Sequence, residues 1–216
     1  MKVIVFGATG GTGRAVIAKL LADGHDVTAF ARDPSKLEAA PGLTIVHGDA
    51  MRAADVAGAM PAHDAVVVSL GNSQNPFALL LGARRSTPSN ICEVGTRNII
   101  AALPTASPVP VIAVTAFGIG DTRDRLTFMI KLFYRLVLRE HIADKERQEA
   151  ALKESGLDFV LIQPLALTDK PAAGTWFANA SGEIRKQEVA RADLAAFIVQ
   201  ELADRRHSRQ TLAFSG

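Results

Sequence analysis

Four glycines within seven residues are the feature that most limits what this chain can fold into. The motif Gly7-Ala-Thr-Gly10-Gly-Thr-Gly13 follows an apolar segment at 3–6 and precedes a helical pattern over 13–23. Gly7 permits a tight turn, and Gly10 lets the backbone approach a pyrophosphate closely. Gly13 allows the helix to pack against the sheet. Amides at the start of the helix then face the phosphates of a dinucleotide. The alternative is a glycine-rich turn that binds no ligand.

Short apolar runs alternate with helical patterns along the rest of the chain. Strands rich in Val and Ile, separated by helices, are typical of a parallel sheet that is buried on both faces. Right-handed crossovers then give a doubly wound α/β fold of the Rossmann type. We therefore predict one domain over residues 1–216, with small C-terminal elements on the substrate side. The strands are expected at 3–6, 27–30, 43–46, 65–70, 109–114 and 159–162, and the helices at 13–23, at 93–103 and around Glu149 and Leu152.

Two further segments are predicted from composition. The stretch 72–90 is rich in Asn, Ser and Pro and is interpreted as a loop at the carboxyl end of the fourth strand. Segment 119–142 contains an apolar, helix-like stretch at 128–133 that continues to Leu136 and Ile142. We expect segment 119–142 to cover one end of the binding site as a lid.

Composition limits the compartment and the kinds of partner expected for this chain. The apolar runs are far shorter than a membrane span, and Lys plus Arg (24) barely exceed Asp plus Glu (22). The single cysteine, Cys92, can form neither an internal disulfide nor a cysteine-based zinc site. We expect a cytoplasmic monomer or weak homodimer that binds a small-molecule substrate, with no metal, nucleic-acid or membrane partner.

The end of the second strand predicts which nucleotide is bound. A site that prefers NAD usually places an acidic residue there to bind the ribose hydroxyls. Here Arg32 occupies the position where a guanidinium can pair with a 2′-phosphate, and Ser35 and Lys36 can add a hydroxyl and an ammonium group. Asp33 is an acid one residue later that can turn inward, and Arg32 and Lys36 can instead be merely solvated. The pattern favours NADP.

The motifs as a set resemble those of a known family. The chain is similar over nearly its whole length to the atypical short-chain dehydrogenases with an NAD(P)H-binding domain, which include flavin reductases of the biliverdin-IXβ reductase type and NmrA-like relatives. Besides the two segments above, the resemblance rests on Gly48-Asp49-Ala50, Ser69-Leu-Gly71, Val114-Thr-Ala-Phe117, Lys153-Glu-Ser-Gly-Leu157 and Gln163-Pro164.

The resemblance implies which residues hold the cofactor. It assigns Asp49 and Ala50 to the adenine, and it places Leu70 and Gly71 beside the ribose-phosphate. Pro164 and Leu165 would lie near the nicotinamide. The glycine loop would contact the cofactor through Gly7, Thr9, Gly10, Gly11, Thr12 and Gly13.

The catalytic residues are harder to assign. Catalytic short-chain dehydrogenases use a Tyr-x-x-x-Lys pair, but the one tyrosine here, Tyr134, is followed four residues later by Leu138. Tyr134 is therefore interpreted as packing on an apolar helix. Lys145 instead stands four residues before Glu149, which is the spacing usual in the family.

One helical turn places His141 on the same face as Lys145. We predict that Lys145 binds the nicotinamide ribose. His141 either donates a proton in place of the tyrosine or is an exposed helical histidine. Thr115, at the end of a strand, is expected to bond a substrate carbonyl or the nicotinamide amide, or only to cap the strand.

Two functions of different classes follow from these residues. The first is an NADPH-dependent oxidoreductase that transfers hydride to a flat, electron-poor acceptor such as a flavin, a quinone or a tetrapyrrole. The alternative is an NADP-binding redox sensor or regulatory protein without turnover, and a sugar-nucleotide epimerase is a weaker third reading. For the reductase, a substrate wall is expected from Phe77, residues 79–81, Phe117, Phe128 and Phe133, although apolar residues there are equally consistent with core packing.

Overall fold

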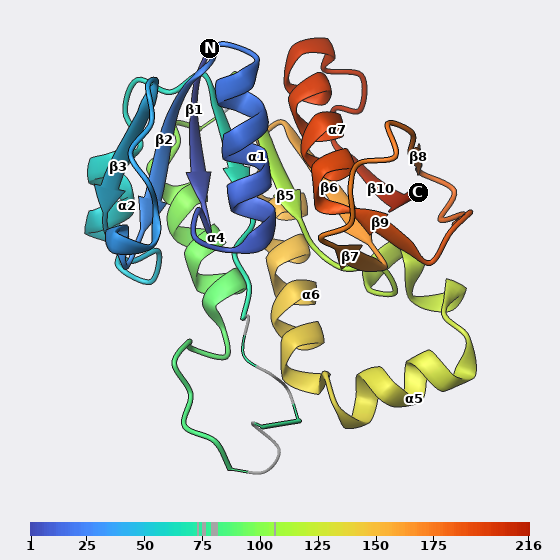
Figure 1. Cartoon of the computed structure of the whole chain (residues 1–216). Coiled ribbons are helices and arrows are strands. Elements are labelled where there is room, and N and C mark those ends of the chain that lie inside the picture. Colours follow the sequence, from blue (N-terminus) through green and yellow to red (C-terminus); the bar gives the residue numbers. More distant parts are fainter. Residues whose placement is uncertain (73, 75–76, 79–81, 106) are drawn as a thin grey trace.

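The fold is built on an eight-stranded, mostly parallel sheet with helices on both faces (Figure 1). The computed structural model describes residues 1–72, 74, 77–78, 82–105 and 107–216. The strand order is β3-β2-β1-β4-β5-β6-β10-β8, and only β8 pairs antiparallel within this sheet. The strands of this sheet are β1 (Lys2–Phe6), β2 (Asp26–Ala31), β3 (Leu43–His47), β4 (Ala65–Val68), β5 (Val111–Val114), β6 (Phe159–Pro164), β10 (Gln210–Ser215) and β8 (Phe177–Asn179).

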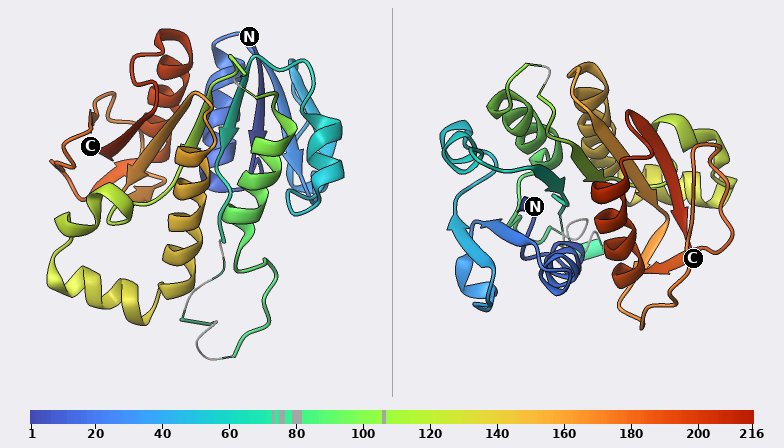
Figure 2. Two further views of the ribbon diagram at one scale, coloured as in Figure 1. Left: turned by 180° about the vertical axis from the view of Figure 1, so that it is seen from behind. Right: turned by 90° about the horizontal axis from the view of Figure 1, so that it is seen from above.

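The central strands are buried on both faces because a layer of helices covers each side. Every residue of β4, β5 and β6 is buried. On one face, α1 (Gly11–Ala22) packs against α7 (Arg191–Asp204). The other face is covered by α2 (Ala53–Ala59), α4 (Ile91–Ala102) and α6 (Arg139–Glu154), as the view from above shows (Figure 2). These layers confirm the predicted doubly wound α/β fold.

The predicted elements are present, with shifted ends. The first helix begins at Gly11 rather than at 13, and the strand predicted at 109–114 starts at Val111. The strand predicted at 65–70 ends at Val68, after which the chain turns into the site. Sequence reasoning did not identify α2, α7, β10 or the small parallel sheet of β7 (Ala166–Thr168) and β9 (Glu188–Ala190).

Segment 119–142 is not one continuous helix. It divides into the 3₁₀ helix η2 (Gly120–Arg125), the helix α5 (Phe128–Leu136) and the start of α6. Ile130 and Tyr134 of α5 pack against the core cluster of Phe117, Leu126 and Ala213. The described part of the chain contains no helix that is long and apolar enough to cross a membrane.

Candidate functional site

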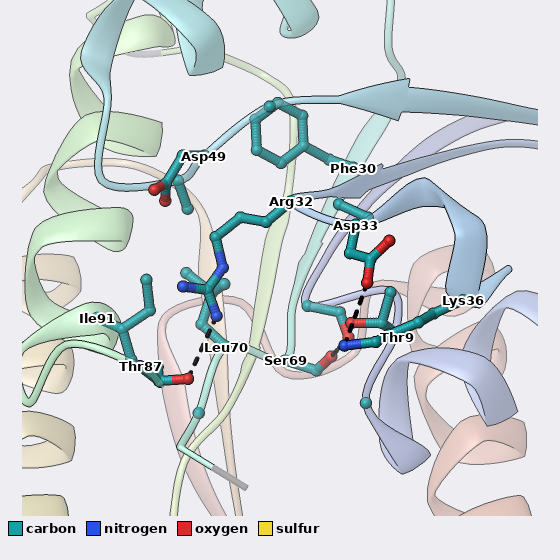
Figure 3. Close-up of a pocket in the computed structure, with 16 residues that line it drawn as sticks. Thr9, Phe30, Arg32, Asp33, Lys36, Asp49, Ser69, Leu70, Thr87 and Ile91 are labelled. Atoms are coloured by element: carbon teal, nitrogen blue, oxygen red, sulfur yellow. Dashed lines mark hydrogen bonds and ion pairs between the residues drawn. The ribbon is translucent and has the colours of Figure 1, made fainter. Parts of the chain in front are cut away.

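A cavity opens where the strand order reverses, at the carboxyl ends of β1 and β4. Open α/β sheets bind their ligands at this topological switch point, because the loops after two neighbouring strands diverge there. The cavity has a volume of about 230 Å³. Figure 3 shows its lining: Gly7, Thr9, Gly10, Phe30, Ala31, Arg32, Asp33, Lys36, Gly48, Asp49, Ala50, Ser69, Leu70, Gly71, Thr87 and Ile91.

The glycine loop has a shape that side chains would destroy. Gly7 has φ +84°, and a Cβ atom there would lie 2.5 Å from the carbonyl oxygen of Ser69 on the adjacent strand end. A Cβ atom on Gly13 would lie 2.2 Å from the carbonyl oxygen of Gly7. Gly13 therefore lets the first turn of α1 pack closely against Gly7, the residue that directly follows β1.

The start of α1 suits a bound anion. The helix N-terminus carries a partial positive charge, and its first turn, described in full, contains no acidic residue. Among the residues that the structure describes, a Cβ atom on Gly10 would meet only the carbonyl oxygen of Gly7, at 3.4 Å, so these residues leave the backbone open to a ligand on this side. The loop therefore fits the diphosphate of a dinucleotide.

Arg14 fixes the glycine loop to the segment that follows β2. Its Nε donates to the carbonyl oxygen of Thr9 at 3.1 Å, and its Nη2 donates to the carbonyl oxygen of Lys36 at 2.9 Å. Sequence reasoning missed this role, because an arginine in the first helical turn has no motif that distinguishes it from a solvated one. Arg14 sets the spacing between the two halves of the cavity.

Arg32 extends across the cavity towards Thr87, as Figure 3 shows. Its Nη2 donates to Thr87 Oγ1 at 3.2 Å. The guanidinium thus faces the cavity from the end of β2, where the sequence predicted it, although its 2′-phosphate contact stays a prediction. Thr87 comes from the 72–90 segment and was not anticipated.

Asp33 belongs to the cavity lining, but its carboxylate is about half exposed and interacts with Ser35 and Lys36, the two residues predicted to assist Arg32. Ser35 Oγ donates to Asp33 Oδ1 at 2.6 Å, and Lys36 Nζ lies 3.3 Å from Asp33 Oδ2. The hydrogen bond from Ser35, followed by that from Lys36, lowers the pKa of Asp33 below its ordinary value. Ser35 does not line the cavity. Any contribution of Ser35 and Lys36 to a 2′-phosphate competes with this carboxylate.

The predicted adenine end is assembled at the ends of β3 and β4. Asp49 and Ala50 line the cavity, and the Asp49 carboxylate accepts a hydrogen bond from the Met51 amide at 3.0 Å. Leu70 and Gly71 belong to the same lining. The four residues therefore share one cavity, and their contacts with adenine and ribose-phosphate stay predictions.

Lys145 ties the cavity to the next strand. Its Nζ donates to the carbonyl oxygens of Leu70 at 2.7 Å and Val114 at 2.8 Å, and to Gln148 Oε1 at 3.0 Å. An ammonium group has three N–H donors, so all of them are used within the protein. Binding of a nicotinamide ribose, as predicted from the sequence, requires Lys145 to release one of these acceptors.

A buried polar network lies behind the end of β5. Thr115 Oγ1 donates to Glu149 Oε1 at 2.5 Å, and Gln163 Nε2 donates to the same oxygen at 2.8 Å. Glu149 Oε2 is buried without a hydrogen-bond partner among the described residues. Burial raises the pKa of Glu149 above its ordinary value, against the hydrogen bonds from Gln163 and Thr115. The Thr115 hydroxyl therefore points into the protein, towards the buried carboxyl group of Glu149.

His141 and Tyr134 are both partly buried. Burial is the main cause that lowers the pKa of His141, so the neutral imidazole is favoured near pH 7. This half-burial differs from the freely exposed histidine that was one of the two expectations, and its catalytic role stays untested. The Tyr134 hydroxyl donates to the carbonyl oxygen of Phe117 at 3.0 Å, which agrees with a packing role.

The predicted substrate wall needs one correction. Phe117 is only 3% exposed and belongs to a core cluster, so it offers no surface to a substrate. Phe128 and Phe133 of α5 are exposed, and the ring of Phe133 lies 6.3 Å from that of Phe77. Residues 79–81, which were also expected in the wall, lie outside the described residues.

The other residues assigned to the cofactor are not part of the cavity lining. Pro164 ends β6, and its carbonyl oxygen accepts a hydrogen bond from the amide of Phe117 at 3.0 Å. Leu165 packs on the core cluster that contains Phe117. Gly11, Thr12 and Gly13 form the first turn of α1.

Comparisons with known proteins agree with this geometry. A family described as NAD(P)H-binding matches residues 7–205. An uncharacterized chloroplastic protein of Arabidopsis thaliana is 26% identical over 205 residues, which cover 93% of this chain and 71% of that protein. An anaerobilin reductase from Escherichia coli is 25% identical, with a TM-score of 0.75, over 100% of this chain and 97% of that chain. A candidate NADH-flavin reductase from Streptococcus pneumoniae is 18% identical, with a TM-score of 0.72, over 99% of this chain and 98% of that chain.

Proposed function

The chain belongs to the NAD(P)H-binding family, and from this premise we propose that it is an NADPH-dependent oxidoreductase acting on a flat, electron-poor acceptor. The acceptor classes that fit are flavins, quinones and tetrapyrroles. The observation that carries the proposal is that the glycine loop and Arg32 face one cavity at the switch point of the sheet. The loop suits the diphosphate, and the guanidinium suits a 2′-phosphate.

In this proposal the nicotinamide supplies the hydride, and the protein positions it. Lys145 holds together the ends of β4 and β5, between which the nicotinamide half would lie. The acceptor takes the hydride, and its proton comes from water. This division suits the site, because the hydroxyl groups of Thr115 and Tyr134 are directed to protein acceptors.

The surroundings of the site support an apolar acceptor. Helix α5 presents Phe128, Met129 and Leu136 to solvent, and each is more than 60% exposed. Tyr134 connects this helix to Phe117, only two residues after Thr115. The similar fold of an anaerobilin reductase and of a candidate flavin reductase adds support for the acceptor class.

The cofactor assignment is tested by titration calorimetry with NADPH and NADH. We expect Arg32→Ala to weaken the binding of NADPH roughly ten- to hundredfold, because charge-assisted hydrogen bonds contribute about 1.5–3 kcal/mol. The binding of NADH should change little. Asp33→Asn should have the opposite effect and strengthen the binding of NADPH, because it frees Ser35 and Lys36. Equal losses of NADPH and NADH in Arg32→Ala would contradict the assignment.

The reaction is tested by NADPH oxidation against a panel of flavins, quinones, tetrapyrroles and aldehydes. Turnover with the flat acceptors supports the reductase. Tight NADPH binding without oxidation by any acceptor would instead favour the redox sensor, which the absence of a Tyr-x-x-x-Lys pair around Tyr134 also suits.

A further inference from the structure

We propose that Arg191 is a further cofactor-binding cation, one that holds the diphosphate rather than the 2′-phosphate. Arg191 is the first residue of α7, which packs beside α1. A Cβ atom on Gly11, the first residue of α1, would lie 2.9 Å from Arg191 Nε and 3.4 Å from its Cζ. Gly11 therefore leaves room for the guanidinium of Arg191 at the start of α1.

The charges around Arg191 favour an anion between it and α1. A cation beside the positive end of a helix is unfavourable unless an anion offsets both charges. The present partner is Asp169, whose Oδ1 lies 2.8 Å from Arg191 Nη1. The Asp169 side chain is 86% exposed, and such a surface pair is weak. A diphosphate at the N-terminus of α1 would be the stronger partner for Arg191, with Asp169 as its competitor.

Arg191 and Arg32 would then recognise different parts of one molecule. Arg32 lies at the end of β2 and faces the cavity on the side of the predicted adenine and 2′-phosphate. Arg191 lies across the glycine loop, on the face covered by α7. The diphosphate is common to NADPH and NADH, whereas the 2′-phosphate is not. This inference rests on the proposed cofactor site, and it assigns to α7 a role in binding.

The experiment measures binding of NADPH, NADH and adenosine 2′-monophosphate to the wild-type protein and its variants. Arg191→Met keeps an aliphatic side chain over Gly11 and should weaken NADPH and NADH equally, about tenfold, because it removes one charge-assisted contact. Adenosine 2′-monophosphate, which lacks the diphosphate, should bind unchanged. Arg32→Ala should give the complementary pattern, with losses for NADPH and adenosine 2′-monophosphate only.

Two controls make the result specific. Arg206→Ala removes an exposed arginine that pairs with Asp204 at the far end of α7, and it should leave all three affinities unchanged. Asp169→Asn releases Arg191 from its competitor and should tighten both dinucleotides by a few-fold. Thermal unfolding of each variant establishes that it is folded.

The outcomes separate this inference from the proposed function. Unchanged dinucleotide affinities in folded Arg191→Met, alongside an NADPH loss in Arg32→Ala, would overturn the role of Arg191 and leave the cofactor site standing. Loss of NADPH alone in Arg191→Met would also overturn it, because the contact would then not be with the shared diphosphate. A wild-type protein that binds neither dinucleotide would overturn the proposed function itself.

Discussion

Lys145 offers the sharpest test of the structure. The sequence predicts that its ammonium group binds the nicotinamide ribose, whereas in the structure all three of its N–H donors already bond to protein acceptors. Replacement by Met keeps most of the aliphatic side chain and removes the ammonium group. The carbonyl oxygens of Leu70 and Val114, and Gln148 Oε1, each lose a charged donor. We therefore expect Lys145→Met to destabilise the protein even without a cofactor.

The size of the effect follows from these contacts. A hydrogen bond to a charged group contributes about 1.5–3 kcal/mol, but contributions within one cluster are not additive. Leu70 also keeps a donor, because Cys92 Sγ lies 3.3 Å from the same oxygen. We expect a loss of about 2–4 kcal/mol in the free energy of unfolding. For a domain of this size the melting temperature would fall by roughly 4–16 °C.

The assay is thermal or urea unfolding of the cofactor-free protein, with Lys153→Met as the matched control on the same helix. Lys153 Nζ pairs with Asp121 Oδ2 at 2.7 Å on the surface, so its loss should cost less than about 1 kcal/mol. If the two variants unfold alike, Lys145 is not held as the structure shows. Reduced turnover at nearly unchanged NADPH affinity would separately support its role in positioning the nicotinamide.

Three further predictions concern the surroundings of Lys145. The raised pKa of Glu149 means that its neutral form stabilises the fold at low pH, and this contribution is lost as the pH rises through the folded-state pKa. Glu149→Gln should therefore gain stability relative to wild type as the pH rises above the ordinary pKa of a glutamate, and a stability difference that is the same at every pH would contradict this. His141→Phe should reduce turnover only slightly, whereas a fall of about 10²–10⁴-fold in steady-state rate would identify a general acid. Segment 119–142 should gain protection from hydrogen exchange when NADPH and acceptor bind, and identical protection would exclude a lid.

The sequence predicted the elements that have a strong local pattern, namely the apolar strands and the glycine loop. Buried strands such as β4 and β5 are unbroken apolar runs, and the glycine loop between β1 and α1 follows a spacing dictated by backbone sterics. Helix α7 was missed because it buries residues around much of its circumference, including Asp193 and Glu201. It therefore has no clean apolar stripe, and its acids suggest solvent exposure until their partners are seen.

The sequence predicted several residues of the site but not the hydrogen bonds that they make. The position of Arg32 follows from the end of the second strand, which the sequence marks, and that of Asp49 follows from the family resemblance. The acceptors of Lys145 include two backbone carbonyl oxygens, and no side-chain pattern encodes these. The contact of Arg191 with the glycine loop depends on α7 lying beside α1, an arrangement that appears only once the sheet is assembled.

The occupied donors around the predicted nicotinamide end favour one class of acceptor over another. Reduction of an aldehyde or ketone requires a proton at the carbonyl oxygen, which protein acids usually supply. Here the Thr115 hydroxyl faces Glu149, the Tyr134 hydroxyl faces Phe117, and burial favours neutral His141. A carbonyl substrate would have to displace one of these contacts, whereas a flavin or quinone can accept hydride while water protonates it. We therefore expect flavins and quinones to be reduced faster than simple aldehydes, and the opposite order would mean that one of these internal bonds breaks in the working enzyme.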